Sequence, residues 1–178
     1  MRWIGLIFAG VNLLDAGAGA LIRIRMATVP DVVTPGLMLN AQIFLSLLNT
    51  ATYCLAVFAQ RSSTRILTIF LYSMMYLGAG AMQLRAIWSS GEPSNHLFPS
   101  LSAILAIGIG LGIMTFNASA RAIALAFALI QMALMLIAIL FLGTNPAQVS
   151  IAILINPFAV IWFLSLPWVR EQFGAATA

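Results

Sequence analysis

Long apolar runs alternate with short polar stretches along the whole chain. Six runs can be distinguished, and they cover residues 3–24, 37–59, 66–88, 97–116, 122–142 and 149–168. Each run is close to the ~20 apolar residues that a helix needs to cross a ~30 Å hydrocarbon core. The runs are continuous, whereas barrel strands would be about 10 residues long with a period of two. The pattern therefore predicts an all-α fold, with residues 1–178 forming a single domain of about six transmembrane helices.

The composition agrees with a membrane protein. Of the 178 residues, 62% are hydrophobic and only 7% are charged, and the mean hydropathy is +1.06. Soluble domains carry about 25% charged residues. The chain has eight basic residues against four acidic ones, which gives a formal charge of +4. All eight basic residues are arginines, since the chain has no lysine. These arginines stand singly or in pairs between apolar runs and do not form the basic stripe of a nucleic-acid binder. The expected partner is the lipid bilayer, and no nucleic acid is expected.

The arginines also predict an orientation. If the loops alternate between two faces, the first face receives five arginines and the second receives three. The first group is Arg2, Arg61, Arg65, Arg121 and Arg170, and the second is Arg23, Arg25 and Arg85. Cytoplasmic loops carry the excess of Arg and Lys in membrane proteins. We therefore predict a multi-pass protein of the cytoplasmic (inner) membrane with both termini cytoplasmic.

The start of the chain permits a second interpretation. Arg2, the apolar stretch after it, and the small residues of Asp15-Ala16-Gly17-Ala18 together resemble a signal peptide with its cleavage site. Cleavage there would leave five spans and would still place the C-terminus in the cytoplasm. The sequence leaves this alternative open.

Asp15 is the most informative single residue. It follows Trp3 by twelve positions, which places it roughly 18 Å into the hydrocarbon core. An ionisable side chain at that depth costs ~2.5–3.5 kcal/mol on insertion scales, so it is expected to face the bundle interior. The candidate charge partner is Arg85 on the third run. Asp15 is then either a proton, ion or ligand site, or a protonated or paired group that holds helices together.

Four further polar residues share its approximate depth. By the 1.5 Å rise per residue, Asn49 lies roughly 12 Å, Gln131 roughly 13 Å, Tyr76 roughly 15 Å and Asn156 roughly 19 Å from the inner surface. Each would be unsatisfied in lipid, so we predict that all four converge with Asp15 in a midplane polar cluster. Such a layer can be a transporter site. Alternatively, its side chains only hold the helices together through hydrogen bonds, each of which stabilises the bundle by about 0.6 kcal/mol.

The fourth run carries two stripes of small residues. Gly108 and Gly112 form one, and Ser102, Ala106 and Gly110 form the other. Stripes of this kind let neighbouring helices approach closely. They predict helix packing and indicate no chemistry.

Recognisable catalytic or metal-binding motifs are lacking. Cys54 is the one cysteine and His96 the one histidine, so neither an internal disulfide nor a bis-histidine haem can form. The neighbours of His96 in the predicted outer loops, Glu92 and Asp31, have no metal-ligand spacing. No catalytic or metal residue is assigned, and the cofactor remains unknown.

Three functions are compatible with this sequence. The first is a non-catalytic accessory or structural subunit of a membrane assembly, in contact with other membrane subunits or with copies of itself. The second is a small transporter or substrate-binding membrane component that uses the midplane cluster. The third is a membrane enzyme with outer-loop chemistry around His96. Short loops and the lack of a reactive constellation favour the first and make an enzyme the least expected of the three.

Overall fold

The computed structural model describes residues 2–27, 36–89, 97–141 and 151–175, and within them every regular element is an α-helix. The seven helices of these residues are α1 (Arg2–Ala27), α2 (Gly36–Phe58), α3 (Ser62–Ser89), α4 (Leu97–Met114), α5 (Ala118–Phe141), α6 (Ile151–Leu164) and α7 (Pro167–Ala175). The prediction of an all-α helix bundle is confirmed at this level.

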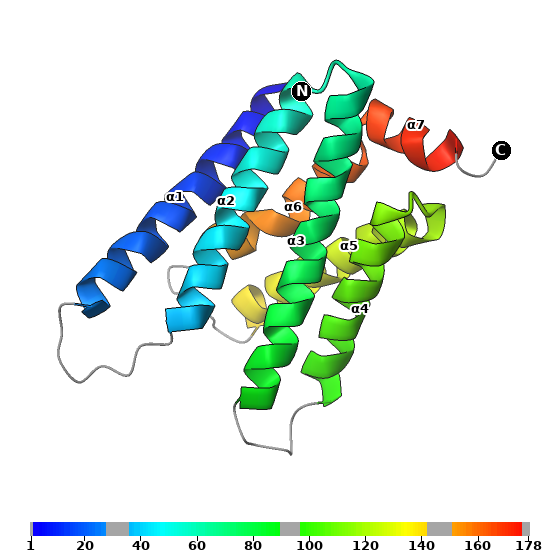
Figure 1. Cartoon of the computed structure of the whole chain (residues 1–178). Coiled ribbons are helices and arrows are strands. Elements are labelled where there is room, and N and C mark those ends of the chain that lie inside the picture. Colours follow the sequence, from blue (N-terminus) through cyan, green and yellow to red (C-terminus); the bar gives the residue numbers. More distant parts are fainter. Residues whose placement is uncertain (1, 28–35, 90–96, 142–150, 176–178) are drawn as a thin grey trace.

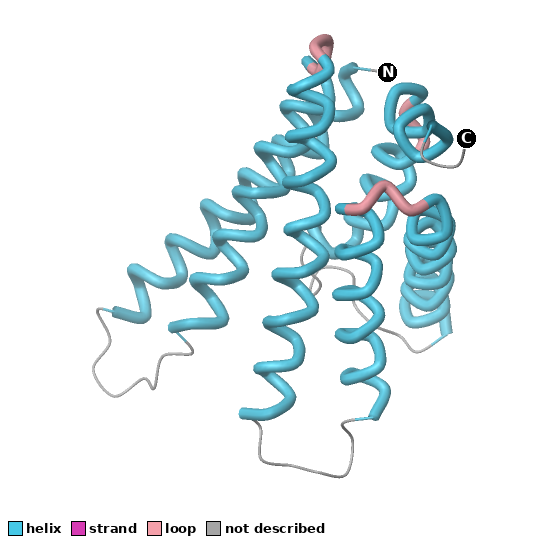
Figure 2. Tube along the Cα trace, turned by 45° about the vertical axis from the view of Figure 1, so that its right-hand side comes forward, coloured by secondary structure: helices cyan, strands magenta, loops and turns pink. Residues whose placement is uncertain are grey.

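The first six helices form a ring in chain order. Each packs against the next, most extensively in the pairs α1–α2 and α3–α4, and α6 returns to pack against α1. Short connections between antiparallel helices produce this kind of neighbour-to-neighbour arrangement. The N-terminus, the α2–α3 turn and α7 lie at one end of the bundle (Figures 1 and 2).

Each of the six predicted runs contains one helix, but not all of these helices have membrane-spanning length. Four segments are long and apolar enough to cross a bilayer, namely Arg2–Arg25, Leu39–Phe58, Ser62–Trp88 and Ala118–Ile137. The apolar parts of α4 and α6 are shorter, Pro99–Met114 and Leu154–Leu164. The structure therefore shows a helical bundle with four membrane-length helices among the described residues.

The end of the sixth run differs from the prediction. The run was expected to continue without a break to Trp168, but α6 ends at Leu164 and a separate helix begins at Pro167. Proline has no N–H to donate, so it interrupts the helical ladder, and it is favoured at the first position of a new helix. In α7, Val169 and Phe173 are buried while Arg170 is exposed. Residues Pro167–Ala175 thus form an amphipathic helix against the bundle end.

An aromatic core fills the ring at the end that holds the termini. Tyr72 of α3 stacks on Phe163 of α6 with ring centroids 4.2 Å apart. Phe8 of α1 makes an edge contact with Trp162 at 5.7 Å, and Tyr53 of α2 lies 6.1 Å from the same indole. Tyr53, Tyr72 and Phe163 are fully buried. Aromatic rings therefore fill the centre of the bundle at this end.

Candidate functional site

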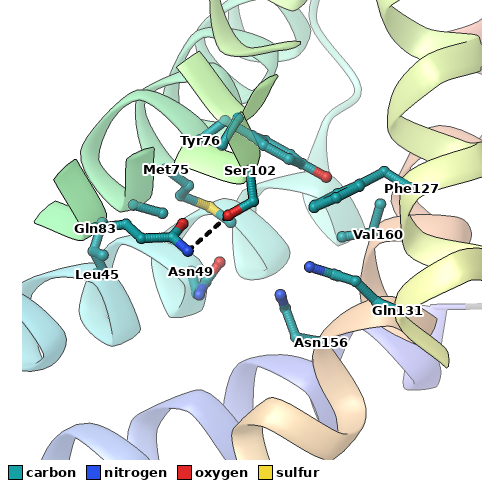
Figure 3. A pocket seen from close by; sticks show the side chains of 12 residues that line it. Leu45, Asn49, Met75, Tyr76, Gln83, Ser102, Phe127, Gln131, Asn156 and Val160 are labelled. Carbon is teal, nitrogen blue, oxygen red and sulfur yellow. Dashed lines mark hydrogen bonds between the residues drawn. The ribbon is translucent and has the colours of Figure 1, made fainter. Parts of the chain in front are cut away.

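A cavity of about 240 Å³ lies among α2, α3, α4, α5 and α6. It extends from the middle of these helices toward the end opposite the termini, as the positions of its residues along α3 and α4 indicate. Its lining residues are Leu45, Asn49, Met75, Tyr76, Ala79, Gln83, Ser102, Ala106, Phe127, Gln131, Asn156 and Val160 (Figure 3). The aromatic core adjoins it through Tyr76, whose ring lies 5.5 Å from that of Tyr72.

One side of the cavity carries a satisfied polar pair. The side-chain amide of Gln83 on α3 donates to Ser102 Oγ on α4 at 2.8 Å. Ser102 Oγ in turn donates to the Pro99 carbonyl at 2.9 Å. These bonds fix the two side chains against each other and join α3 to α4 at the cavity wall.

The other amides of the lining are available to a ligand. Asn49 Oδ1 is buried and has no hydrogen-bond partner among the described residues. The side chains of Gln131 and Asn156 point into the same space from α5 and α6 (Figure 3). Both residues remain solvent-accessible, so the cavity is not sealed on their side. Three carboxamides from three helices thus face one space, and each can both donate and accept.

The chemistry of the lining is polar but uncharged. None of the lining residues is acidic or basic, and the remaining wall is apolar or aromatic, with Met75, Phe127 and Val160 among its members. Transfer of an unpaired ion into such a site would cost far more free energy than transfer of a neutral polar group that finds hydrogen-bond partners. The arrangement therefore suits a neutral solute with both polar and apolar parts.

The structure brings together four of the five residues predicted to form the midplane cluster. Asn49, Tyr76, Gln131 and Asn156 all line the cavity. Asp15 is not among the lining residues, and its Oδ2 accepts a hydrogen bond from Ser46 Oγ on α2 at 2.7 Å. The expectation that Asp15 shares their space is therefore corrected. Its depth was estimated from its position along the chain, but depth does not determine which neighbour its helix face meets.

The predicted charge pair between Asp15 and Arg85 remains a prediction. Arg85 is exposed near the last turns of α3. That helix packs chiefly against α2 and α4, whereas α1 packs chiefly against α2 and α6. The outer-loop residues considered with His96, which are Glu92 and Asp31, lie outside the described residues, as does His96 itself.

Sequence reasoning missed part of the lining, including Gln83, Ser102 and Phe127. A signal for Gln83 was present, because Tyr76, Ala79 and Gln83 are spaced at i, i+3 and i+7 and therefore share one helix face. Gln83 lies closer to the outer end of its run than the residues of the predicted midplane cluster do. The sequence offers no comparable signal for Phe127, since an aromatic residue in an apolar run does not reveal whether it faces lipid or a cavity.

Among the described residues, no group of three or more His, Cys, Asp or Glu side chains is placed to hold a metal ion. No protein-family model matches the chain, and no curated protein or solved structure is significantly similar to it.

Proposed function

We propose that the chain is a polytopic membrane protein that crosses the bilayer six times, with both termini on the cytoplasmic side. The support is the length of the six apolar runs together with the positions of the arginines. Arg2, Arg61 and Arg65 lie at the bundle end that holds the N-terminus and the α2–α3 turn, and Arg170 lies on α7 at the same end (Figure 1). Among the described residues, the apolar parts of α4 and α6 are shorter than a full span, and a short span is accommodated by local thinning of the bilayer.

Within this topology, the function that the geometry supports best is binding of a small neutral polar solute in the central cavity, as a transporter or a substrate-binding component. The observation that carries this proposal is the group of amides from Asn49, Gln131 and Asn156 around one open space. In an accessory subunit, these residues would serve only to hold the helices together. Their amides would then be hydrogen-bonded directly to one another, and apolar side chains would fill the space between them.

The size of the cavity limits the solute. Its volume of about 240 Å³ corresponds to roughly eight waters at ~30 Å³ each, and a cavity of ~150 Å³ is enough for benzene. A single ring that carries one amide or hydroxyl group therefore fits. Because the aromatic core closes the bundle on the side of the termini, the solute is proposed to enter from the opposite side or laterally past α5.

The test is binding of size-matched neutral and charged probes to the purified full chain in detergent. Benzamide, benzoate and benzylamine have the same shape and differ in charge. Thermal unfolding with increasing probe concentration should show stabilisation by benzamide, through mass action, and little or none by the two ions. Asn49→Leu and Asn156→Leu should each weaken benzamide binding about tenfold, the loss expected for one hydrogen bond in a desolvated site.

A matched control is Gln42→Leu, since Gln42 is an exposed amide of α2 that does not line the cavity. It should leave benzamide binding unchanged. Equal stabilisation by all three probes, or equal losses from Gln42→Leu and Asn49→Leu, would contradict the proposal and favour the accessory-subunit alternative.

A further inference from the structure

A second pocket lies at the bundle end that holds the termini, among α1, α2, α3, α6 and α7. Its volume is about 340 Å³, and it shares no lining residue with the central cavity. The lining consists of Arg2, Ala56, Val57, Ala59, Gln60, Arg65, Trp162, Leu166 and Trp168. Two guanidinium groups, one amide and two indoles thus meet in one concave surface.

Arg65 is held in a defined position at this pocket. Its Nε donates to the carbonyl of Ala59 at 3.2 Å. Its guanidinium carbon lies 5.9 Å from the ring centroid of Trp168, within cation–π range. These two contacts orient the planar guanidinium and leave its terminal nitrogens for another acceptor. An oriented guanidinium of this kind is suited to two-point recognition of a phosphate group.

The electrostatic field in the pocket is positive. None of its lining residues is acidic. The N-terminal ends of α1, α3 and α7 and the C-terminal ends of α2 and α6 lie here, so the partial charges of the helix ends offset one another in part and leave a small positive excess. Arg2 and Arg65 add to this positive field.

The opposite wall of the pocket is apolar and aromatic. Trp162, Leu166 and Trp168 form it, and the indole N–H of Trp162 is buried with no hydrogen-bond acceptor among the described residues. Indoles with one apolar face and one donor are typical of the membrane–water interface. A ligand that combines an anionic group with an apolar body would use both walls.

We propose that this pocket binds the phosphodiester headgroup of an anionic phospholipid. Arg2 and Arg65 contact the phosphate, and the Trp162–Leu166–Trp168 wall contacts the glycerol and the first acyl carbons. A lipid is favoured over a free phosphate because the apolar wall would have no partner on a small anion, and because basic pockets between helices at this level of the membrane are lipid headgroup sites. The proposal rests on the membrane fold and is independent of the solute proposed for the central cavity.

A neighbouring pocket is less suitable for an anion. It is lined by Arg121 and Arg170, but Glu171 lines it as well. The Nε of Arg121 already donates to the carbonyl of Leu164 at 2.9 Å. The carboxylate of Glu171 repels a phosphate, and the bond from Arg121 to Leu164 leaves fewer donors of that guanidinium for a ligand.

The experiment titrates the purified full chain in a nonionic detergent with three soluble probes and follows thermal unfolding. The probes are dioctanoyl phosphatidylglycerol, dioctanoyl phosphatidylcholine and glycerol 3-phosphate. Phosphatidylglycerol should stabilise the protein at low concentration and lose this effect as salt is raised. The other two probes should bind at least tenfold more weakly. Arg65→Gln and Arg2→Gln should each weaken phosphatidylglycerol binding about tenfold.

The matched control is Arg61→Gln, which removes the same charge one helical turn before Arg65 from an exposed residue that does not line the pocket. It should leave lipid binding within about twofold. If Arg65→Gln unfolds the protein by removing the bond to Ala59, Arg2→Gln still provides the measurement. Equal affinity for the two lipids, or equal losses from Arg61→Gln and Arg2→Gln, would overturn the proposal. Glycerol 3-phosphate binding as tightly as phosphatidylglycerol would overturn the lipid assignment.

Discussion

Ser46 on α2 donates a hydrogen bond from its Oγ to Oδ2 of Asp15 on α1, at 2.7 Å. Ser46 is only 5% exposed, so the bond lies within the contact between the two helices. A carboxyl group in the apolar part of a membrane-length helix is thereby satisfied by the neighbouring helix of the same hairpin. Asp15 thus acts as a contact between α1 and α2, outside the cavity.

Replacement of either partner should lower stability without changing solute binding. Ser46→Ala removes the donor, and Asp15→Leu leaves the Ser46 hydroxyl unsatisfied. Each should cost about 1 kcal/mol in the free energy of unfolding. Asp15→Asn should cost less, because the amide oxygen still accepts. Equilibrium unfolding in detergent, combined with a double-mutant cycle on Ser46→Ala and Asp15→Leu, measures the coupling energy between the two side chains.

The control for this pair is Ser63→Ala, at an exposed serine in the first turn of α3. It should change stability by less than about 0.5 kcal/mol. If Asp15→Asn abolishes benzamide binding while Ser46→Ala does not, the carboxylate has a role at the solute site that its position outside the cavity lining does not explain.

Much of the fold could be predicted from the sequence because lipid imposes a simple rule. A helix that crosses a bilayer must be apolar over a fixed length, so run lengths and polar breaks locate helices directly. The break between α6 and α7 was missed because the residues on both sides of it are apolar. Only Ser165 and Pro167 mark it, and a proline inside a hydrophobic run is also compatible with an unbroken helix, as Pro157 in α6 shows.

The cavity was predictable only in part, for a related reason. The cost of an unsatisfied amide in lipid indicates that Asn49, Gln131 and Asn156 should turn inward, and their shared depth indicates that they should meet. The same reasoning failed for Asp15, because a second interior surface, the α1–α2 contact, was equally able to satisfy it. Depth is readable from the sequence, whereas the neighbour that each helix face meets depends on packing.

Arg121 should be important for stability as well as for topology. Its Nε donates to the carbonyl of Leu164 at 2.9 Å, which ties the start of α5 to the last turn of α6. Carbonyls at the C-terminal end of a helix lack intrahelical partners, so this bond satisfies one of them. Arg121→Ala should lower the free energy of unfolding by about 1–2 kcal/mol, measured by denaturant titration in detergent.

Arg61→Ala is the corresponding control, since Arg61 lies in the exposed α2–α3 turn. It removes the same charge from the same end of the bundle. Equal effects of Arg121→Ala and Arg61→Ala would show that net charge, and not the bond to Leu164, determines the result.

The proposed topology can be tested with reporters that are active on one side of the membrane only. A fluorescent reporter fused after Ala178 should be active in the cytoplasm, because the proposed topology places five arginines on the side of the termini and three on the other side. An alkaline phosphatase inserted within residues 90–96 should be active outside it. A C-terminal reporter active only outside the cytoplasm would invert the proposed orientation.

The close contact between α3 and α4 should depend on the absence of a side chain at Gly80. A Cβ there would lie 2.7 Å from the carbonyl oxygen of Ala103 and 2.7 Å from Cγ1 of Ile107. Ile107 can rotate, but the carbonyl belongs to the backbone of α4, so the two helices must separate. Gly80→Ala should therefore destabilise the protein by about 1–3 kcal/mol, even though alanine is the better helix former by ~1 kcal/mol.

Gly108→Ala is the matched substitution on the partner helix. A Cβ at Gly108 would meet nothing within 4 Å, so this variant should be at least as stable as the parent. Since Gln83 and Ser102 bond across the same α3–α4 contact at the cavity wall, Gly80→Ala should also weaken benzamide binding, whereas Gly108→Ala should not. Thermal unfolding and probe titration of both variants measure the two effects together. Equal stability of the two variants would mean that α3 and α4 are not held in this close contact, and the Gln83–Ser102 bond would then no longer define the cavity wall.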